Sequence, residues 1–568
     1  MPHALSMPAP GFQAIILCGP GSSFPTFTAN ADENPKALLP IANRPMVWYP
    51  IDFCYRMGIT NITLITPPSS SPAITAAMNT NPHLTGLPLP KPDILAPEGL
   101  DQNTGTAHIF RLPEVRAIVT GDFIVLPCDL VCELGGESLL ETWMVKEAGL
   151  GGATGGGPES TGPKMALGGE RGGRRGGLGV WYQTKGGPKG EETDFIATSP
   201  LESSVVPPSR SSLVPNVSNL VYSMPTDTLN DITEEKKSLP IRHSLVRNHS
   251  RIRMLSTHRD AHIYIFPAWI IDMINNNEHM DSIGEDVIGW WAKAGWQAGL
   301  ADKLGLREVF SNSKTVDSDD NLLDNSHESD DIDFGSLSST WTSKLGDDPT
   351  QASMVDEKSN TLAADTEIVV PPILAYVHPS TSPGPLIRRV DTAPLLLSIS
   401  LQLAKLESIA EVGKDAASPF AHPSKVAYPE GIAPRCTVTR PDSLLAENVT
   451  VEEKSAIKEC VIGANCQIKQ GAKLTRCVLM DGVVVGKGCK LTGCVLGRRS
   501  EIGEDSILQD CEVQENLMVE ARTEDKNNKL MSSEGMEATE EEIQESFADE
   551  DMADAADDQA DFDPDSSA

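Results

Sequence analysis

The chain has 568 residues, and its 80 acidic residues outnumber its 46 Lys and Arg residues to give a formal charge of −34. Two tracts without Lys or Arg hold most of this excess: Glu534–Ala568 with 15 acids and Asp317–Asp333 with 8. A protein that tracks nucleic-acid phosphates needs clustered bases, so this class is disfavoured and no direct nucleic-acid partner is expected.

The compartment is predicted from what the sequence lacks. No run approaches the 18 apolar residues of a membrane-spanning helix, and no secretory signal is visible at the start. Eleven cysteines occur without a CxxC pair or zinc-ligand spacing. We therefore expect reduced thiols in a cytosolic protein, with no metal site, and exclude a secreted scaffold held by disulfides.

Residues 12–310 alternate strand-like and helix-like segments. The apolar run Phe12–Cys18 predicts a buried strand, and small residues follow it. Met46–Met57 has apolar residues at helical spacing and predicts a helix, which Pro50 would interrupt near its start. Asn61–Thr66 predicts the next strand. A strand–helix–strand unit implies a right-handed crossover and a mainly parallel sheet. Further strands are expected at residues 122–126, 179–184 and 262–266.

Two segments are predicted to stay disordered. Residues 149–178 are a Gly-rich insertion, whose arginines would at most touch RNA weakly, and residues 311–365 are an acidic linker. A connecting segment follows at residues 366–425. In it, residues 373–377 predict a strand and residues 393–406 a helix with one apolar stripe.

A repeat of 17 residues is the clearest pattern in residues 426–522. Cys460, Cys477, Cys494 and Cys511 mark successive repeats, and aliphatic residues fall between them at steps of six and five. Three such steps per turn predict a triangular parallel β-helix. The four cysteines are expected to stack in a column. We favour packing over metal binding there, because ligands in a row do not form a tetrahedron.

The segment 13–46 resembles the nucleotidyltransferases that couple sugar 1-phosphates to nucleoside triphosphates. The matching residues are Gly19, Gly21 and the run Asn34-Pro35-Lys36-Ala37-Leu38-Leu39-Pro40, with Gly105-Thr106-Ala107 and Leu126-Pro127-Cys128-Asp129 further on. The resemblance implies an α/β, Rossmann-like nucleotidyltransferase fold. It also implies a nucleotide pocket at Gly19, Gly21, Lys36, Gly105 and Asp129, with the lysine on a phosphate and the aspartate on Mg²⁺.

The departures from this family predict a vestigial pocket. Ser23 stands where the family's enzymes carry an arginine, and the Val-Glu-Lys-Pro and Trp-x-Asp-x-Gly motifs are absent. Transfer of a nucleotidyl group depends on positioned charge, so we expect no catalytic residue and no cofactor. Lys36 and Asp129 would then serve the fold. Acyl transfer is also excluded, because the last histidine, His422, precedes the repeats.

A transferase-like domain followed by a hexapeptide β-helix resembles the gamma and epsilon subunits of translation initiation factor 2B, and the β-helices of this type are left-handed. The gamma subunits are the better match, through the run from Lys36 to Pro50 and the segments Arg251–Tyr264 and Ser282–Val287. An epsilon subunit would continue into a helical exchange domain, whereas residues 523–568 form only an acidic tail, predicted to be disordered.

The resemblance implies a non-catalytic subunit that supports epsilon in GDP/GTP exchange on initiation factor 2. Its expected partners are epsilon, the other subunits of factor 2B and factor 2 itself. The alternative is an active sugar-1-phosphate nucleotidyltransferase, similar to mannose-1-phosphate guanylyltransferase. A third possibility is a pocket that binds a nucleotide or sugar phosphate as a regulatory ligand. The tail is interpreted as solubilising, or as docking on a basic surface of a partner or of its own chain.

Overall fold

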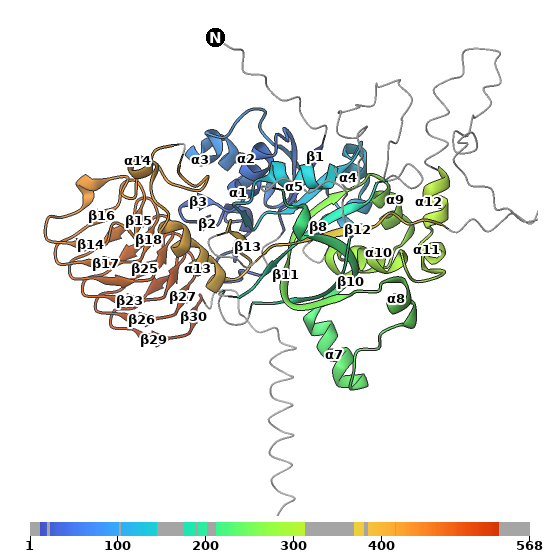
Figure 1. Cartoon of the computed structure of the whole chain (residues 1–568). Helices are drawn as coiled ribbons and strands as arrows, with labels where there is room; N and C mark the ends of the chain where they lie inside the picture. Colours follow the sequence, from blue (N-terminus) through green and yellow to red (C-terminus); the bar gives the residue numbers. More distant parts are fainter. Residues whose placement is uncertain are drawn as a thin grey trace, which may run out of the picture.

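The computed structural model describes residues 12–19, 23–101, 104–144, 175–185, 187, 191–201, 212–312, 368–379, 384–414 and 416–532. A mixed α/β body and a stack of short parallel strands lie side by side, with helix α13 (Ala393–Ala404) between them (Figure 1). This architecture confirms the predicted fold class. Within the described ranges, no helix has the length and apolar content needed to cross a membrane.

The α/β body is built on a nine-stranded sheet with the order β5-β4-β1-β6-β11-β8-β12-β10-β9. Strand β1 runs parallel to β4 and β6, so that Ile16 lies opposite Leu64 and Leu126. The other half is mostly antiparallel, because β11 is longer than expected and pairs antiparallel with β6, β8 and β9. The prediction of a mainly parallel sheet therefore holds only for the first half. The strands are β1 (Gln13–Leu17), β4 (Asn61–Ile65), β5 (Asp93–Leu95), β6 (Phe123–Pro127), β8 (Gly177–Gln183), β9 (Asp194–Pro200), β10 (Val217–Pro225), β11 (Arg253–Phe266) and β12 (Ile373–Val377).

Helices cover both faces of this sheet. Successive residues of β1 therefore pack into two different hydrophobic cores, Ile15 into the core on one face and Ile16 into the core on the other. The predicted helix at 46–57 is confirmed as α1 (Trp48–Arg56). Pro50 occupies its third position, where the missing N–H has no partner inside the helix. The other α-helices before the linker are α2 (Ser71–Thr80), α3 (Pro82–Thr85), α4 (Pro113–Ile118), α5 (Gly136–Trp143), α7 (Thr226–Lys236), α8 (His243–Asn248), α9 (Trp269–Asn276), α10 (Ile288–Ala294), α11 (Leu300–Lys303) and α12 (Leu306–Asn312), and α14 (Ile409–Val412) follows α13.

The segment expected to connect the two bodies is part of both. Strand β12 inserts between β8 and β10, with Leu374 opposite Leu178 and Ala375 opposite Ser218. Strand β13 (Ile387–Arg389) pairs antiparallel with β7 (Leu130–Cys132). Helix α13 then contacts β2 (Pro40–Ile41) of the first body and β18 (Val461–Ile462) and β21 (Val478–Leu479) of the second. The first body is therefore complete only when the chain returns after residue 367.

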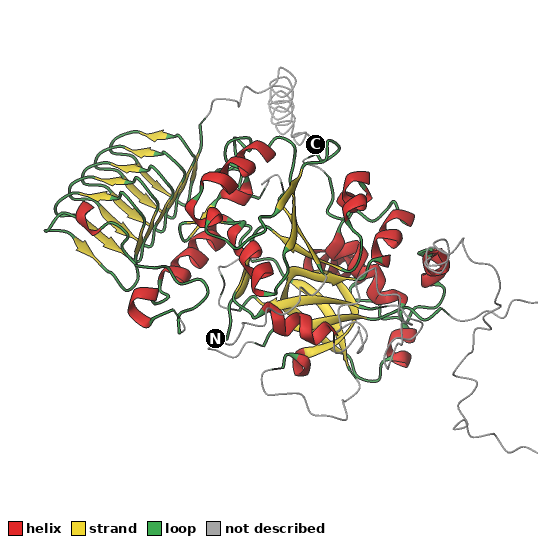
Figure 2. Cartoon of the chain, turned by 90° about the horizontal axis from the view of Figure 1, so that it is seen from above, coloured by secondary structure: helices red, strands yellow, loops and turns green. Residues whose placement is uncertain are grey.

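The second body is the predicted β-helix, with three parallel sheets along its sides (Figure 2). Its register advances by one repeat per coil, since Ala456 pairs with Lys473 and Lys473 with Lys490. The aliphatic residues at steps of six and five are buried inside. The strands not yet named are β14 (Thr437–Val438), β15 (Leu444–Leu445), β16 (Thr450–Val451), β17 (Ala456–Lys458), β19 (Gln467–Ile468), β20 (Lys473–Thr475), β22 (Val484–Val485), β23 (Lys490–Thr492), β24 (Val495–Leu496), β25 (Glu501–Ile502), β26 (Ile507–Gln509), β27 (Glu512–Val513), β28 (Met518–Val519), β29 (Glu524–Lys526) and β30 (Lys529–Leu530).

The coils continue beyond the predicted end at residue 522. Strands β29 and β30 fall within the expected acidic tail, and their backbones pair with β26 and β27. The polar composition of β29 concealed this coil, because backbone pairing with the coil before it needs no apolar side chain. The rest of the expected tail, residues 533–568, lies outside the described residues, as do residues 313–365 of the linker and most of the Gly-rich insertion. Strand β8 begins at Gly177, inside the range expected for that insertion.

The four repeat cysteines are buried in successive coils. Each thiol donates to the carbonyl two residues before it, as from Cys477 Sγ to Thr475 O over 3.2 Å and from Cys511 Sγ to Gln509 O over 3.2 Å. In the described part of the chain, no three His, Cys, Asp or Glu side chains are placed to hold a metal ion. The thiols are therefore satisfied by the β-helix backbone.

Candidate functional site

A cavity of about 190 Å³ opens at the carboxyl ends of β1 and β6. Leu17, Cys18 and Gly19 form one side, at the end of β1, and Cys128 and Asp129 form another, after β6. Ligands of open α/β sheets bind at such strand ends. The remaining wall is mainly apolar and comes from Ile65, Leu100, Ile109, Val125, Tyr264 and Ile283.

The structure brings most of the predicted site residues to this cavity. Gly19, Lys36 and Asp129 line it directly. Gly105 lies between two lining residues, and a Cβ added to it would meet the carbonyl oxygen of Asp281 at 2.3 Å, so the close approach requires glycine. Gly21 lies outside the described residues.

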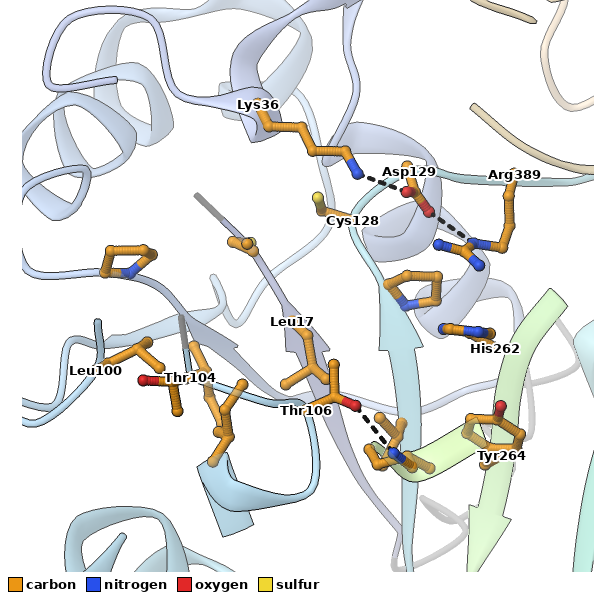
Figure 3. A pocket seen from close by; sticks show the side chains of 18 of the residues that line it. Leu17, Lys36, Leu100, Thr104, Thr106, Cys128, Asp129, His262, Tyr264 and Arg389 are labelled. Carbon is orange, nitrogen blue, oxygen red and sulfur yellow. Dashed lines mark hydrogen bonds and ion pairs between the residues drawn. The ribbon is translucent and has the colours of Figure 1, made fainter. Parts of the chain in front are cut away.

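Three charged residues of the cavity, Lys36, Asp129 and Arg389, are paired with one another. Lys36 Nζ donates to Asp129 Oδ2 over 2.7 Å, and Arg389 Nε donates to Asp129 Oδ1 over 3.4 Å. Figure 3 shows the two cations reaching the carboxylate from different elements. Burial alone would raise the pKa of Asp129, but the charges of Lys36 and Arg389 outweigh burial and hold that pKa well below its usual value. Asp129 is thus a buried carboxylate with both oxygens engaged.

Arg389 was missed by the sequence analysis. It lies on β13, 260 residues from Asp129, and no local motif marks it. Only the pairing of β13 with β7, directly after Asp129, brings the guanidinium to the cavity. It also lies 3.9 Å from the carboxylate of Asp391. A long-range strand pairing is the kind of signal that one sequence does not carry.

His262 narrows the cavity from the side of β11. Its φ of 52° lies in the left-handed region, which costs a residue with a side chain about 1–3 kcal/mol. The ring lines the cavity, and burial, reinforced by the charge of Arg389, lowers the pKa of His262 well below its usual value. Its backbone N–H donates to Asp260 Oδ1 over 2.8 Å. A neutral imidazole therefore occupies this part of the wall.

Asp260 lies directly behind this wall. It also accepts a hydrogen bond from the hydroxyl of Tyr264. Burial, together with the nearby charge of Asp194, raises the pKa of Asp260 to about 7. A carboxyl group in contact with the wall is therefore partly protonated near neutral pH.

The cations of the cavity bear on whether it could carry out nucleotidyl transfer. Among the described lining residues, the Lys and Arg side chains are Lys36 and Arg389, and both already neutralise Asp129. Ser23, which replaces the arginine of the family's enzymes, is exposed to solvent. A triphosphate needs cations that are not otherwise engaged, and a catalytic Mg²⁺ needs a carboxylate with free oxygens. Lys36, Arg389 and Asp129 therefore satisfy one another's charge within the chain.

The β-helix holds the segment that carries Lys36. Arg498 Nη1 donates to Asn34 Oδ1 over 2.6 Å, and the amide of Asn34 also donates to the carboxylate of Glu515. Nearby, Asn43 Nδ2 donates to the carbonyl of Ile462 over 2.9 Å. We call residues 24–39, the segment that carries Lys36, the cavity loop. These contacts fix the cavity loop against the coils, so the two bodies form one unit.

Comparisons with known proteins support the resemblance seen in the sequence. Residues 430–524 match the family model described as the EIF2B subunit epsilon LbH domain. The chain is also 25% identical to translation initiation factor eIF2B subunit gamma of Schizosaccharomyces pombe over 315 residues. That match covers 55% of this chain and 58% of the relative, so the chain spans less than two thirds of the curated protein. The resemblance to initiation factor 2B subunits is confirmed.

Proposed function

We propose that this chain, which is similar to eIF2B subunits along both of its bodies, is a gamma-type subunit of initiation factor 2B. In this role it supports the epsilon subunit in GDP/GTP exchange on initiation factor 2, in the cytosol. Its partners are epsilon, the other subunits of the factor and factor 2 itself. The similarity to a gamma relative and the match of the β-helix support this assignment.

The proposal that this subunit has no catalytic activity rests on the pairing of Asp129 with Lys36 and Arg389. An enzyme of the nucleotidyltransferase type must keep its carboxylate for Mg²⁺ and its lysine for phosphate. Here each group is the partner of the other inside the protein. Binding a nucleotide with Mg²⁺ would require breaking a buried ion pair, which opposes turnover.

Nucleotide exchange does not require a catalytic side chain from this subunit. A factor accelerates GDP release when it binds the nucleotide-free GTPase more tightly than the GDP-bound form. A rigid scaffold that presents epsilon in one orientation lowers the entropic cost of its binding to factor 2. The fixed junction between the cavity loop and the coils, through Asn34 and Arg498, gives such rigidity.

Affinity purification of the chain from its native source tests the assignment. We expect epsilon-like, other factor 2B and factor 2 polypeptides to co-purify, identified by mass spectrometry. The purified chain should release no pyrophosphate from GTP and mannose 1-phosphate. Pyrophosphate release that disappears in a Lys36→Ala variant would instead establish the alternative, a sugar-1-phosphate nucleotidyltransferase. Recovery of the chain without these partners would contradict the proposal.

A further inference from the structure

A second cavity, of about 170 Å³, is lined by residues of α8 and α10. These two helices lie at the end of the α/β body away from the β-helix (Figure 1). We call the cavity the α8–α10 groove. It shares no lining residue with the first cavity, and none of its described lining residues is acidic. The lining residues are Phe195, Ala197, Tyr222, Leu239, Pro240, Ile241, Arg242, Leu245, Met254, Trp290, Lys293, Trp296 and Gln297.

The floor of the groove is a small apolar core, and its rim exposes large apolar side chains. Leu245 and Trp296 are buried in the floor. At the rim, Ile241 is 47% exposed, Met254 45% and Trp290 40%. Exposed apolar side chains gathered around a concave site are typical of a docking surface.

A lysine is held at the rim by two aromatic rings. Lys293 Nζ lies 4.6 Å from the centre of the Tyr222 ring and 5.0 Å from that of Trp290. Burial, reinforced by the charge of Arg242, lowers the pKa of Lys293, so its ammonium is a poorly solvated cation. A carboxylate that reaches this ammonium would therefore bind more strongly than at a fully hydrated lysine.

The chain segment that contains α8 is basic, unlike the chain as a whole. From Lys236 to Arg259 the sequence has seven Lys and Arg residues, three His and no acid, although the whole chain carries a charge of −34. Arg259 is buried and paired with Asp391. The other six are exposed and form no ion pair with any described residue: Lys236, Lys237, Arg242, Arg247, Arg251 and Arg253.

We propose that the α8–α10 groove binds the acidic tail of the same chain, residues 534–568. The tail supplies 15 acids and no base, which complements the six unpaired cations. It also supplies apolar anchors, since Ile543 and Phe547 are flanked on both sides by acids. This proposal is independent of the proposed function.

The length of the tail allows this contact. Residues 533–568 follow the last coil and extend to at most about 120 Å, whereas a folded domain of 300 residues has a diameter of about 50 Å. Attachment to the same chain gives the tail a high effective concentration at the groove. The apolar floor favours a peptide over RNA, because phosphates would satisfy the cations but leave the floor beside Leu245 unfilled.

Site-specific photo-crosslinking in the full-length chain tests the proposal. A benzophenone amino acid replaces Phe547, and mass spectrometry locates the crosslinked residues. We expect crosslinks to Met254 and Trp290 at low salt, with the yield falling as ionic strength rises. The double variant Arg242→Glu/Arg247→Glu should lower the yield by about fivefold or more, since like charges then face the tail. Both arginines are exposed, so the fold is retained.

Matched variants and probes make the result decisive. Lys487→Glu/Lys490→Glu, an exposed charge reversal on the β-helix, should leave the yield unchanged. Trp290→Ser should lower it without changing any charge. Crosslinks that map outside the groove would overturn the proposal. A crosslink yield that stays unchanged in both the Arg242→Glu/Arg247→Glu and the Trp290→Ser variants would also overturn it. So would groove crosslinks from a probe at Leu323 in the acidic linker but not from Phe547. Binding of a single-stranded RNA that depends on Arg242, without tail crosslinks, would identify a nucleic-acid site instead.

Discussion

The two cavities of the α/β body use their cations in opposite ways. In the first cavity, Lys36 and Arg389 form ion pairs with the buried Asp129, and these pairs hold the wall together. In the α8–α10 groove, Arg242 and its neighbours face solvent without an ion-pair partner among the described residues. A cation that is paired inside the chain supports the fold, whereas one left unpaired at an apolar rim is available to another segment. The predictions below test this distinction.

The largest effect is expected when Asp129 is removed. An Asp129→Ala variant leaves Lys36 and Arg389 as partly buried cations without their shared partner, which should lower the free energy of unfolding by about 3–5 kcal/mol. Urea denaturation measures this change. As a control, Asp302→Ala breaks the exposed ion pair with Arg307 and should cost less than about 1 kcal/mol. Equal losses in the two variants would show that the first cavity is not held by its charges.

The sequence predicted the β-helix far better than it predicted the first cavity. Each coil repeats the inward aliphatic pattern of the coil before it, so local spacing defines the fold from Ile462 to Leu508. The cavity, in contrast, is assembled from segments far apart. Lys36 and Asp129 were found by resemblance, but Arg389 reaches the site only because β13, which follows residue 367, pairs with β7.

The α8–α10 groove was not predicted for a similar reason. Five elements from β9 to α10 contribute to it, and none carries a motif. The basic stretch that starts at Lys236 was a signal in the sequence, but only the structure shows which of its side chains are exposed. The partners implied by resemblance remain predictions, because no contact within one chain tests them.

A second prediction concerns the pH dependence of stability that Asp260 gives to the chain. The pKa of Asp260 is about 7 in the folded chain and near 4 when unfolded, so between these values the folded state binds more protons. The free energy of unfolding should therefore fall as pH rises from 4 through 7, by roughly 4 kcal/mol at most. Urea denaturation across this range should show the fall in the natural chain and lose it in Asp260→Asn. The exposed substitution Asp93→Asn should keep the fall; a slope shared by all three chains would refute this assignment.

A smaller effect is expected at the junction between the cavity loop and the coils. Arg498→Ala removes the hydrogen bond to Asn34 and should lower the free energy of unfolding by about 1–1.5 kcal/mol. Amide hydrogen exchange should accelerate in the segment 24–39, because it loses its anchor on the β-helix. The adjacent Arg499→Ala, which changes an exposed side chain, is the control. Unchanged exchange in Arg498→Ala would mean that the β-helix does not hold the cavity loop.

The smallest effect is predicted for nucleotide binding to the first cavity. Because Lys36 and Arg389 already neutralise Asp129, GTP with Mg²⁺ has no unengaged cation among the described lining residues. With a dissociation constant of about 1 mM or weaker, 1 mM ligand adds at most about 0.4 kcal/mol, a shift in melting temperature of roughly 1 °C. Thermal denaturation with and without GTP or mannose 1-phosphate measures it. A shift of about 5 °C that Lys36→Ala abolishes would show that ligand phosphates displace Asp129 from its lysine. In that case the paired charges would be a closed but working nucleotide site, and the contrast between the two cavities would describe two ligand sites.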